Sequence, residues 1–89
     1  MKIELFYMPA FIHQLDHLPH VLQEEALEKI EEFKDVRNHK KLRVHKLTGS
    51  LVGRCSFSVD YRNRIVFRWL DKSQKSAVLL AVGDHDIYR

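Results

Sequence analysis

The apolar run at residues 77–82 is the feature that most constrains the fold. Its letters, AVLLAV, include no polar or charged side chain, so this segment has no face suited to solvent. A short run of this kind is typical of a strand that is buried on both faces. The chain has 89 residues, which is enough for one domain and no more. We therefore expect a single domain, residues 1–89, with a central strand at 77–82.

Two segments before this run alternate between apolar and polar side chains, which is the pattern of half-buried strands. The apolar members are Cys55, Phe57 and Val59 in the first segment, and Ile65, Phe67 and Trp69 in the second. Turns are expected near residues 60–61 and 71–74. These three C-terminal strands should form an antiparallel meander, and residues 2–7 read as a further short strand.

Residues 9–36 have the spacing of helices. Pro9 opens a short helix, and Pro19 suits the first turn of a second one. The second helix is expected to run to about Val36 and to have an acidic outer face. Its apolar stripe comprises Leu22, Ala26, Leu27, Ile30 and Phe33. The predicted fold is α+β in the order β-α-α-β-β-β, with a helical hairpin packed on one face of the antiparallel sheet.

Charge is divided unevenly along the chain. Residues 1–36 hold three basic and eight acidic side chains, a net charge of −5, whereas residues 37–68 hold nine basic and one acidic, a net charge of +8. This division favours a basic surface for a polyanion, although a polarised solvated surface is the plainer alternative.

The location of the protein can also be predicted. A single cysteine, Cys55, allows no internal disulfide and suits a reducing compartment. No stretch has the length of a membrane span or the layout of a signal peptide. We expect a cytoplasmic protein with no membrane partner.

Four arginines follow the sheet face that the core does not use: Arg54, Arg62, Arg64 and Arg68. Like charges on paired strands repel each other, and a bound polyanion would relieve that repulsion.

Two histidines, His45 and His85, flank this face in the sequence. Histidine changes charge near neutral pH, so two of them can supply a base and an acid. RNA cleavage needs both, together with a cation for the transition-state charge. An ordinary polar outer face is the alternative.

Three further histidines, His13, His17 and His20, have spacings that helical metal ligands can show. Pro19 interrupts the helix between the last two, so solvent-facing or partner-facing histidines are the preferred interpretation. We expect no metal and no cofactor.

Four segments together resemble the RelE/ParE superfamily of bacterial toxins, and among them the YoeB-like and YafQ-like ribonucleases. They are HKLTG at 45–49, GR at 53–54, YRNRIVF at 61–67 and VGDHDIY at 82–88. The superfamily pattern is a Leu-x-Gly turn, a strand starting after glycine, an arginine followed by apolar residues on the third strand, and an ending with Gly-x-His or Gly-x-Arg before tyrosine. The expected element order also matches, so the resemblance spans nearly the whole chain.

The resemblance implies the toxin of a type II toxin–antitoxin system, a metal-independent endoribonuclease that cleaves mRNA on the ribosome and is inhibited by an antitoxin protein. Arg64 falls on the arginine that contacts the scissile phosphate. His85 falls on the histidine of the YoeB-like and YafQ-like members, His45 on their base, and Tyr88 on a tyrosine that contacts RNA. The expected RNA-binding residues are Lys46, Arg54, Arg62 and Arg68.

One departure from the family limits the mechanism. RelE carries lysines where this chain has Cys55, Ser56, Phe57 and Ser58, which favours a mechanism with two histidines. A ParE-like toxin that poisons DNA gyrase, or a degenerate member that only binds its antitoxin, are the alternative functions.

Overall fold

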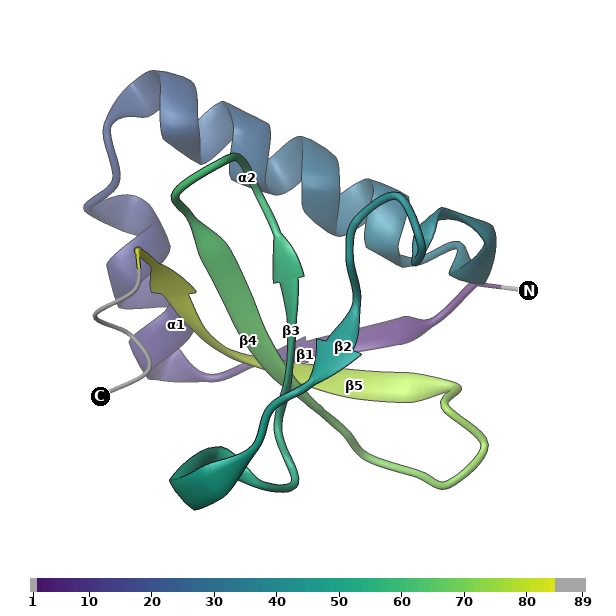
Figure 1. Cartoon of the computed structure of the whole chain (residues 1–89). Coiled ribbons are helices and arrows are strands. Elements are labelled where there is room, and N and C mark those ends of the chain that lie inside the picture. Colours follow the sequence, from purple (N-terminus) through teal and green to yellow (C-terminus); the bar gives the residue numbers. More distant parts are fainter. Residues whose placement is uncertain (1, 85–89) are drawn as a thin grey trace.

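A mixed five-stranded sheet with two helices makes up the fold of residues 2–84, the part of the chain that this computed structural model describes (Figure 1). The helices are α1 (Pro9–Asp16) and α2 (His20–Phe33). The strands are β1 (Glu4–Tyr7), β2 (His45–Lys46), β3 (Cys55–Ser58), β4 (Arg64–Trp69) and β5 (Ser76–Gly83). Two short 3-10 turns, η1 (Val36–Asn38) and η2 (Gly49–Leu51), lie between α2 and β3. The α+β class and the order of the helices and main strands are confirmed.

The strands lie in the order β1-β5-β4-β3-β2. β5 pairs with β1 on one side and with β4 on the other, so the prediction of a central strand at 77–82 is confirmed. β3, β4 and β5 form the expected antiparallel meander. Two features were not predicted. β1 runs parallel to β5, which makes the sheet mixed, and the two-residue strand β2 adds to β3.

The core lies between α2 and the sheet. Phe33 of α2 is fully buried, and its ring centroid lies 4.5 Å from that of Phe57 and 4.7 Å from that of Phe67. Each such ring stabilises the fold by about 1.5–3 kcal/mol through its burial. Trp69 packs against this cluster, as its position in the alternation predicted. Cys55 is also a core residue, and burial raises the pKa of its thiol.

Several boundaries differ from the sequence-based expectation. α2 ends at Phe33 rather than near Val36, because Asp35 leaves the helix and accepts a hydrogen bond from the Arg37 N–H at 2.9 Å, which starts η1. Pro19 is the residue before α2 rather than part of its first turn. β3 and β4 are shorter than their alternation suggested, since the turn between them occupies residues 59–63.

α1 closes one edge of β5 where β1 ends. The ladder between β1 and β5 stops at Tyr7 and Leu79. Beyond it, the side-chain oxygen of Gln14 accepts a hydrogen bond from the backbone N–H of Val82 at 2.9 Å. An exposed strand edge would otherwise leave this donor to solvent or to another chain. The helix therefore fixes the last part of β5.

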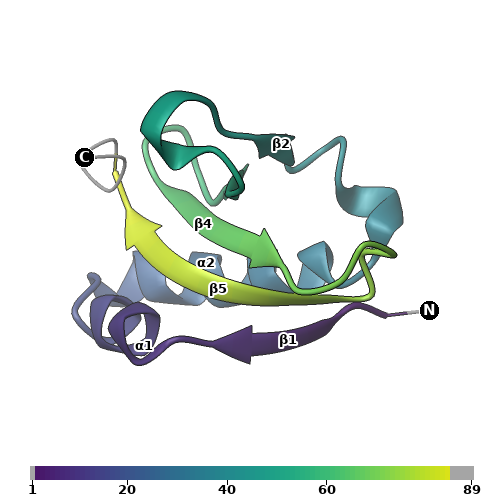
Figure 2. The same cartoon turned by 90° about the horizontal axis from the view of Figure 1, so that it is seen from below.

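The sheet face opposite α2 is called the outer face here. Residues that pair across neighbouring strands point to the same side, so the registers assign its members: Phe6, His45, Ser56, Ser58, Arg64, Val66, Arg68, Val78 and Ala81. Figure 2 looks onto β4 and β5 with α2 behind them. Ser56, Val66 and Val78 are buried although they lie outside the core cluster, so this face is not the uniformly polar surface that the alternation suggested.

Candidate functional site

The strand registers bring His45 and Arg64 to the same face of the sheet. His45 pairs with Ser56, and Arg64 pairs with Ser58, which lies two residues further along β3. The backbones of His45 and Arg64 are thus two strand spacings and two residues apart, or about 12 Å. Both backbones therefore lie on one face of the sheet. The Arg64 guanidinium is directed toward the β3–β4 turn, where it bonds to the backbone oxygen of Asp60.

The β3–β4 turn holds Arg64 in place. Its guanidinium Nη1 donates to the backbone oxygens of Asp60 at 2.7 Å and Asn63 at 3.1 Å. Arg64 is half-buried, and these two bonds occupy one end of its planar fork. The other nitrogens remain as donors of the kind that bind phosphate oxygens in pairs.

The Asp60 side chain organises the same turn. Its Oδ1 accepts from the backbone N–H groups of Arg62 at 2.9 Å and Asn63 at 2.7 Å. Partial burial alone would raise the pKa of Asp60, but the hydrogen bonds from Asn63 and Arg62 and the nearby charge of Arg64 lower it overall. The carboxylate is therefore ionised and serves to shape the turn that carries Arg64.

A backbone carbonyl orients the His45 ring. Nδ1 of His45 lies 2.8 Å from the backbone oxygen of Arg43. A carbonyl oxygen only accepts, so this bond requires the proton on Nδ1. In the neutral ring, Nε2 then carries the free lone pair. The side chain is exposed, and the contact at Nδ1 leaves Nε2 as the accepting nitrogen of the neutral ring.

Arg43 is one of the nine basic residues of the segment 37–68 but was not expected at the site. It lines a pocket of about 270 Å³ together with Ser58, Asp60, Tyr61 and Arg64. Its backbone lies in the left-handed region, with φ at 58°, which is uncommon for a residue with a side chain. This conformation directs the Arg43 carbonyl at His45. No local signal in the sequence, such as a glycine, marks the position.

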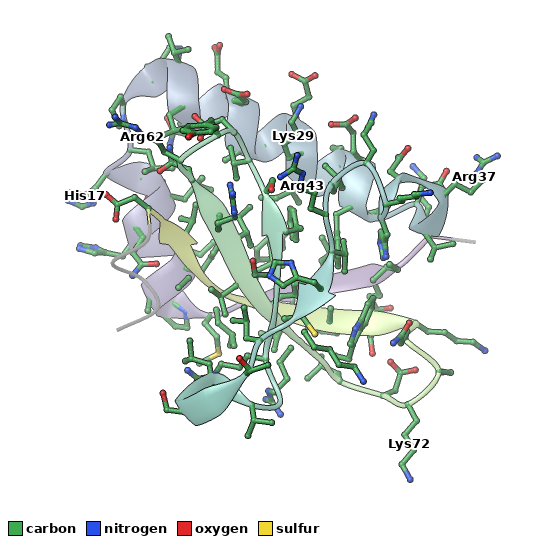
Figure 3. All side chains as sticks on the ribbon, viewed as in Figure 1. His17, Lys29, Arg37, Arg43, Arg62 and Lys72 are labelled. Carbon is green, nitrogen blue, oxygen red and sulfur yellow. The ribbon has the colours of Figure 1, made fainter. Side chains whose placement is uncertain are left out.

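The predicted RNA-binding residues are only partly brought together. Arg68 is exposed on the outer face, and Arg54 directly precedes Cys55, the partner of Phe67, so these two arginines are neighbours in the register. The other two predicted residues lie elsewhere in the fold, and their RNA-binding role stays a prediction. Arg62 lies in the β3–β4 turn rather than on a strand (Figure 3). Lys46 pairs with Cys55 and so lies on the side of the core, where it lines a pocket with Trp69 and Arg54.

Four ion pairs of the described chain gather around α2 and η1. They join Lys34 to Glu31 at 2.6 Å, Arg37 to Asp35 at 2.7 Å, and both Lys29 and Lys41 to Glu32. The Arg37 guanidinium and backbone lower the pKa of Asp35 to about 2. Acidic side chains of residues 1–36 thus pair with Arg37 and Lys41, whereas the arginines of β4 lie on another surface.

Two predicted catalytic residues, His85 and Tyr88, lie outside the described residues. β5 ends at Gly83, which pairs with Arg64.

The histidines of the helical hairpin form no metal site among residues 2–84. The rings of His13 and His17 lie 4.3 Å apart, and Nδ1 of His17 bonds to the backbone oxygen of His13. His20 instead pairs with Glu24 at 2.9 Å. The interruption at Pro19 separates His20 from the other two, as expected.

A search of the described residues for membrane spans finds no helix with the length and apolar character that a span requires.

Solved toxin structures share this arrangement of strands and helices. A mutant of the Escherichia coli toxin RelE in the free state superimposes with a TM-score of 0.71 at 16% identity, covering 99% of this chain and 92% of RelE. The chain has the RelE-like toxin fold. YafQ from E. coli gives 0.68 at 13% identity, with 98% of both chains covered. The toxin–antitoxin complex RelBE2 from Mycobacterium tuberculosis gives 0.65 at 21% identity, covering 96% of this chain and all of that one.

The resemblance to the RelE/ParE superfamily is therefore confirmed at the level of the fold. No family model and no curated protein sequence matches the chain. The RelE-like fold positions His45, Arg43 and Arg64 in space, and the chemistry of those side chains has to carry the functional conclusion.

Proposed function

We propose that this chain is the toxin of a toxin–antitoxin system and acts as a metal-independent endoribonuclease on mRNA. The observation that carries the proposal is the pairing of an oriented histidine with an anchored arginine on one sheet face. His45 has its Nδ1 proton engaged by the Arg43 carbonyl, and Arg64 is held by the β3–β4 turn. The RelE-like fold and the net charge of +8 over residues 37–68 support it.

In this mechanism, Nε2 of His45 accepts the proton of a ribose 2′-hydroxyl. The 2′-oxygen attacks the adjacent phosphorus, and the bond from phosphorus to the 5′-oxygen breaks. His85 donates a proton to that leaving oxygen, and Tyr88 holds the RNA. Arg64 stabilises the charge that develops on the phosphate oxygens. The products are a 2′,3′-cyclic phosphate and a 5′-hydroxyl, so no water is consumed in the cleavage step, and the histidines and Arg64 supply the roles that a metal would otherwise fill.

Induction in bacterial cells tests this function against the gyrase alternative. Primer extension on cellular mRNA should show new cleavage ends within minutes, and the ends should be missing when Arg64→Ala is induced instead. Intact mRNA together with gyrase-linked DNA breaks would instead identify a ParE-like toxin. The assay should include ribosome-bound and naked RNA, since the resemblance implies cleavage on the ribosome.

An antitoxin protein is proposed as the physiological partner, in the cytoplasm. RelBE2 from M. tuberculosis and RelE–RelB from Pyrococcus horikoshii are toxin–antitoxin or RelE–RelB complexes in which one chain has the same fold as this one. An acidic antitoxin segment laid over the outer face would cover Arg64 and Arg68 and exclude RNA.

Neutralising two arginines outside the catalytic pair should weaken RNA binding through charge alone. For the double variant Arg54→Gln, Arg68→Gln, we expect the slope of log affinity against log salt to fall by about 1.4, since each contact with a single-stranded phosphate contributes about 0.7. Fluorescence anisotropy at several salt concentrations measures this slope. The matched control is Lys29→Gln, Arg37→Gln, because these two cations pair with Glu32 on α2 and with Asp35 beside η1, on the α2 side of the sheet (Figure 3). Equal slopes for the two double variants would contradict the proposed binding face.

Replacing Arg43 tests the role of its side chain separately from the role of its carbonyl, which bonds to His45. Arg43→Gly keeps a residue that favours the left-handed backbone at φ 58°, so His45 should stay oriented while one phosphate ligand is lost. We expect KM to rise about tenfold, the equivalent of ~1.4 kcal/mol for one charged hydrogen bond, with kcat almost unchanged. Arg43→Lys should recover part of the loss. A fall in kcat at constant KM would show instead that Arg43 acts on the reacting phosphate.

A further inference from the structure

An exposed aromatic residue lies on the outer face beside the basic strand. Phe6 is the third residue of β1, and 47% of its surface is exposed. Its neighbours in β1, Leu5 and Tyr7, pair with the core residues Ala77 and Leu79, so Phe6 points to the other side of the sheet. The fold has no need of an exposed phenylalanine in the middle of a strand, because the core is filled from the opposite face.

The register places Phe6 in one row with Arg68. Both residues pair with Val78 of β5, Phe6 through the parallel ladder and Arg68 through the antiparallel one. Val78 is only 6% exposed although it lies outside the core cluster. Phe6 and Arg68 flank this short side chain on the outer face, about 10 Å apart in their backbones. An aromatic ring and a guanidinium thus border an apolar floor.

This row continues into the candidate active site. Arg68 and Arg64 lie on the same strand and the same face, four residues or about 13 Å apart. An RNA strand bound with its scissile phosphate at Arg64 can therefore run along β4 toward Phe6. Single-stranded bases stack on aromatic side chains presented by a sheet, while cations beside the ring hold the backbone.

We propose that Phe6 stacks on a base of single-stranded RNA whose backbone is held by Arg68, so that the row Phe6–Val78–Arg68 is a nucleotide subsite next to the cleavage site. This inference rests on the proposed ribonuclease function. RNA is favoured over a protein as the occupant because the ring is paired with a cation across an apolar floor rather than surrounded by apolar side chains alone. Glu4, one row further along β1, bounds the subsite on that side.

The test compares wild type, Phe6→Leu and Phe6→Trp in their affinity for a 2′-O-methyl oligonucleotide, which cannot be cleaved and carries 2-aminopurine as a stacking reporter. Leucine keeps the apolar volume but removes the π-face. We expect Phe6→Leu to weaken binding by about 5- to 150-fold, the range for one stacked base, and to lose the fluorescence quenching. Phe6→Trp should bind as wild type does. The salt slope should stay the same in both, because no charge is removed.

The control is Leu27→Ala, which alters an apolar residue on α2 that is 49% exposed and should bind like wild type. Equal affinity and quenching for Phe6→Leu and wild type would overturn the subsite and assign the exposed ring to a protein contact. That outcome leaves the ribonuclease proposal intact if Arg54→Gln, Arg68→Gln still weakens binding. A wild-type protein that binds no RNA at low salt would overturn both.

Discussion

Replacing Arg64 with alanine is expected to lower the rate of RNA cleavage by about 10²–10³-fold, the usual effect of removing one preorganised charge contact from a transition state. The loss should appear in kcat, because the guanidinium acts on charge that develops only as the bond to the 5′-oxygen breaks. Single-turnover cleavage at saturating protein measures it. The protein should stay folded, since Arg64 is only half-buried and bonds to two turn carbonyls rather than to the core.

Two variants make this prediction specific. Arg64→Lys keeps the positive charge but lacks the planar guanidinium. The guanidinium can bond the Asp60 and Asn63 carbonyls and still present donors to a phosphate, whereas an ammonium group is a single point charge. Arg64→Lys should therefore recover only part of the rate. Arg37→Ala removes an exposed arginine that is paired with Asp35 on η1, and its rate should match wild type. If Arg64→Ala and Arg37→Ala cleave equally well, Arg64 does not contact the reacting phosphate.

Removing the imidazole of His45 should cost about 10²–10⁴-fold in rate, the range for a positioned general base. His17 provides a matched control, because its Nδ1 also bonds to a backbone carbonyl at 2.8 Å but on α1. His17→Ala should keep the wild-type rate.

The acid–base assignment fails if the double variant His45→Ala, His85→Ala folds and still cuts RNA at the wild-type rate. A loss confined to His85→Ala would leave the acid in place and require another base.

The sequence specifies the meander well because its signals are local. Phe57 and Phe67 alternate with polar residues, and residues 77–82 are apolar without interruption, so strand type and core face follow from the pattern. The pairing of β1 with β5 could not be read in this way. It joins residues about seventy positions apart, such as Glu4 and Ser76, and the choice between parallel and antiparallel neighbours depends on the whole tertiary arrangement.

The candidate site was predictable to a smaller extent. Arg64 was assigned through the family resemblance, and the structure shows what holds it, namely the Asp60 turn. Arg62 lies in that same turn and not on the strand, because the Asp60 carboxylate accepts hydrogen bonds from the backbone N–H groups of Arg62 and Asn63. Arg43 was missed because the left-handed backbone that directs its carbonyl at His45 has no signature in the sequence. β2 was missed because two residues are too short for an alternation pattern.

The chemical ends of the cleaved RNA test the central claim most directly. Purified chain is incubated with mRNA, both on ribosomes and naked with EDTA, and the products are mapped by end-specific ligation. Attack by the 2′-hydroxyl, with His45 as base and Arg64 at the phosphate, predicts 2′,3′-cyclic phosphates and 5′-hydroxyls, and both should vanish in His45→Ala and Arg64→Ala. Products with 3′-hydroxyls and 5′-phosphates, or cyclic phosphates that persist at the wild-type rate in both variants, would contradict it.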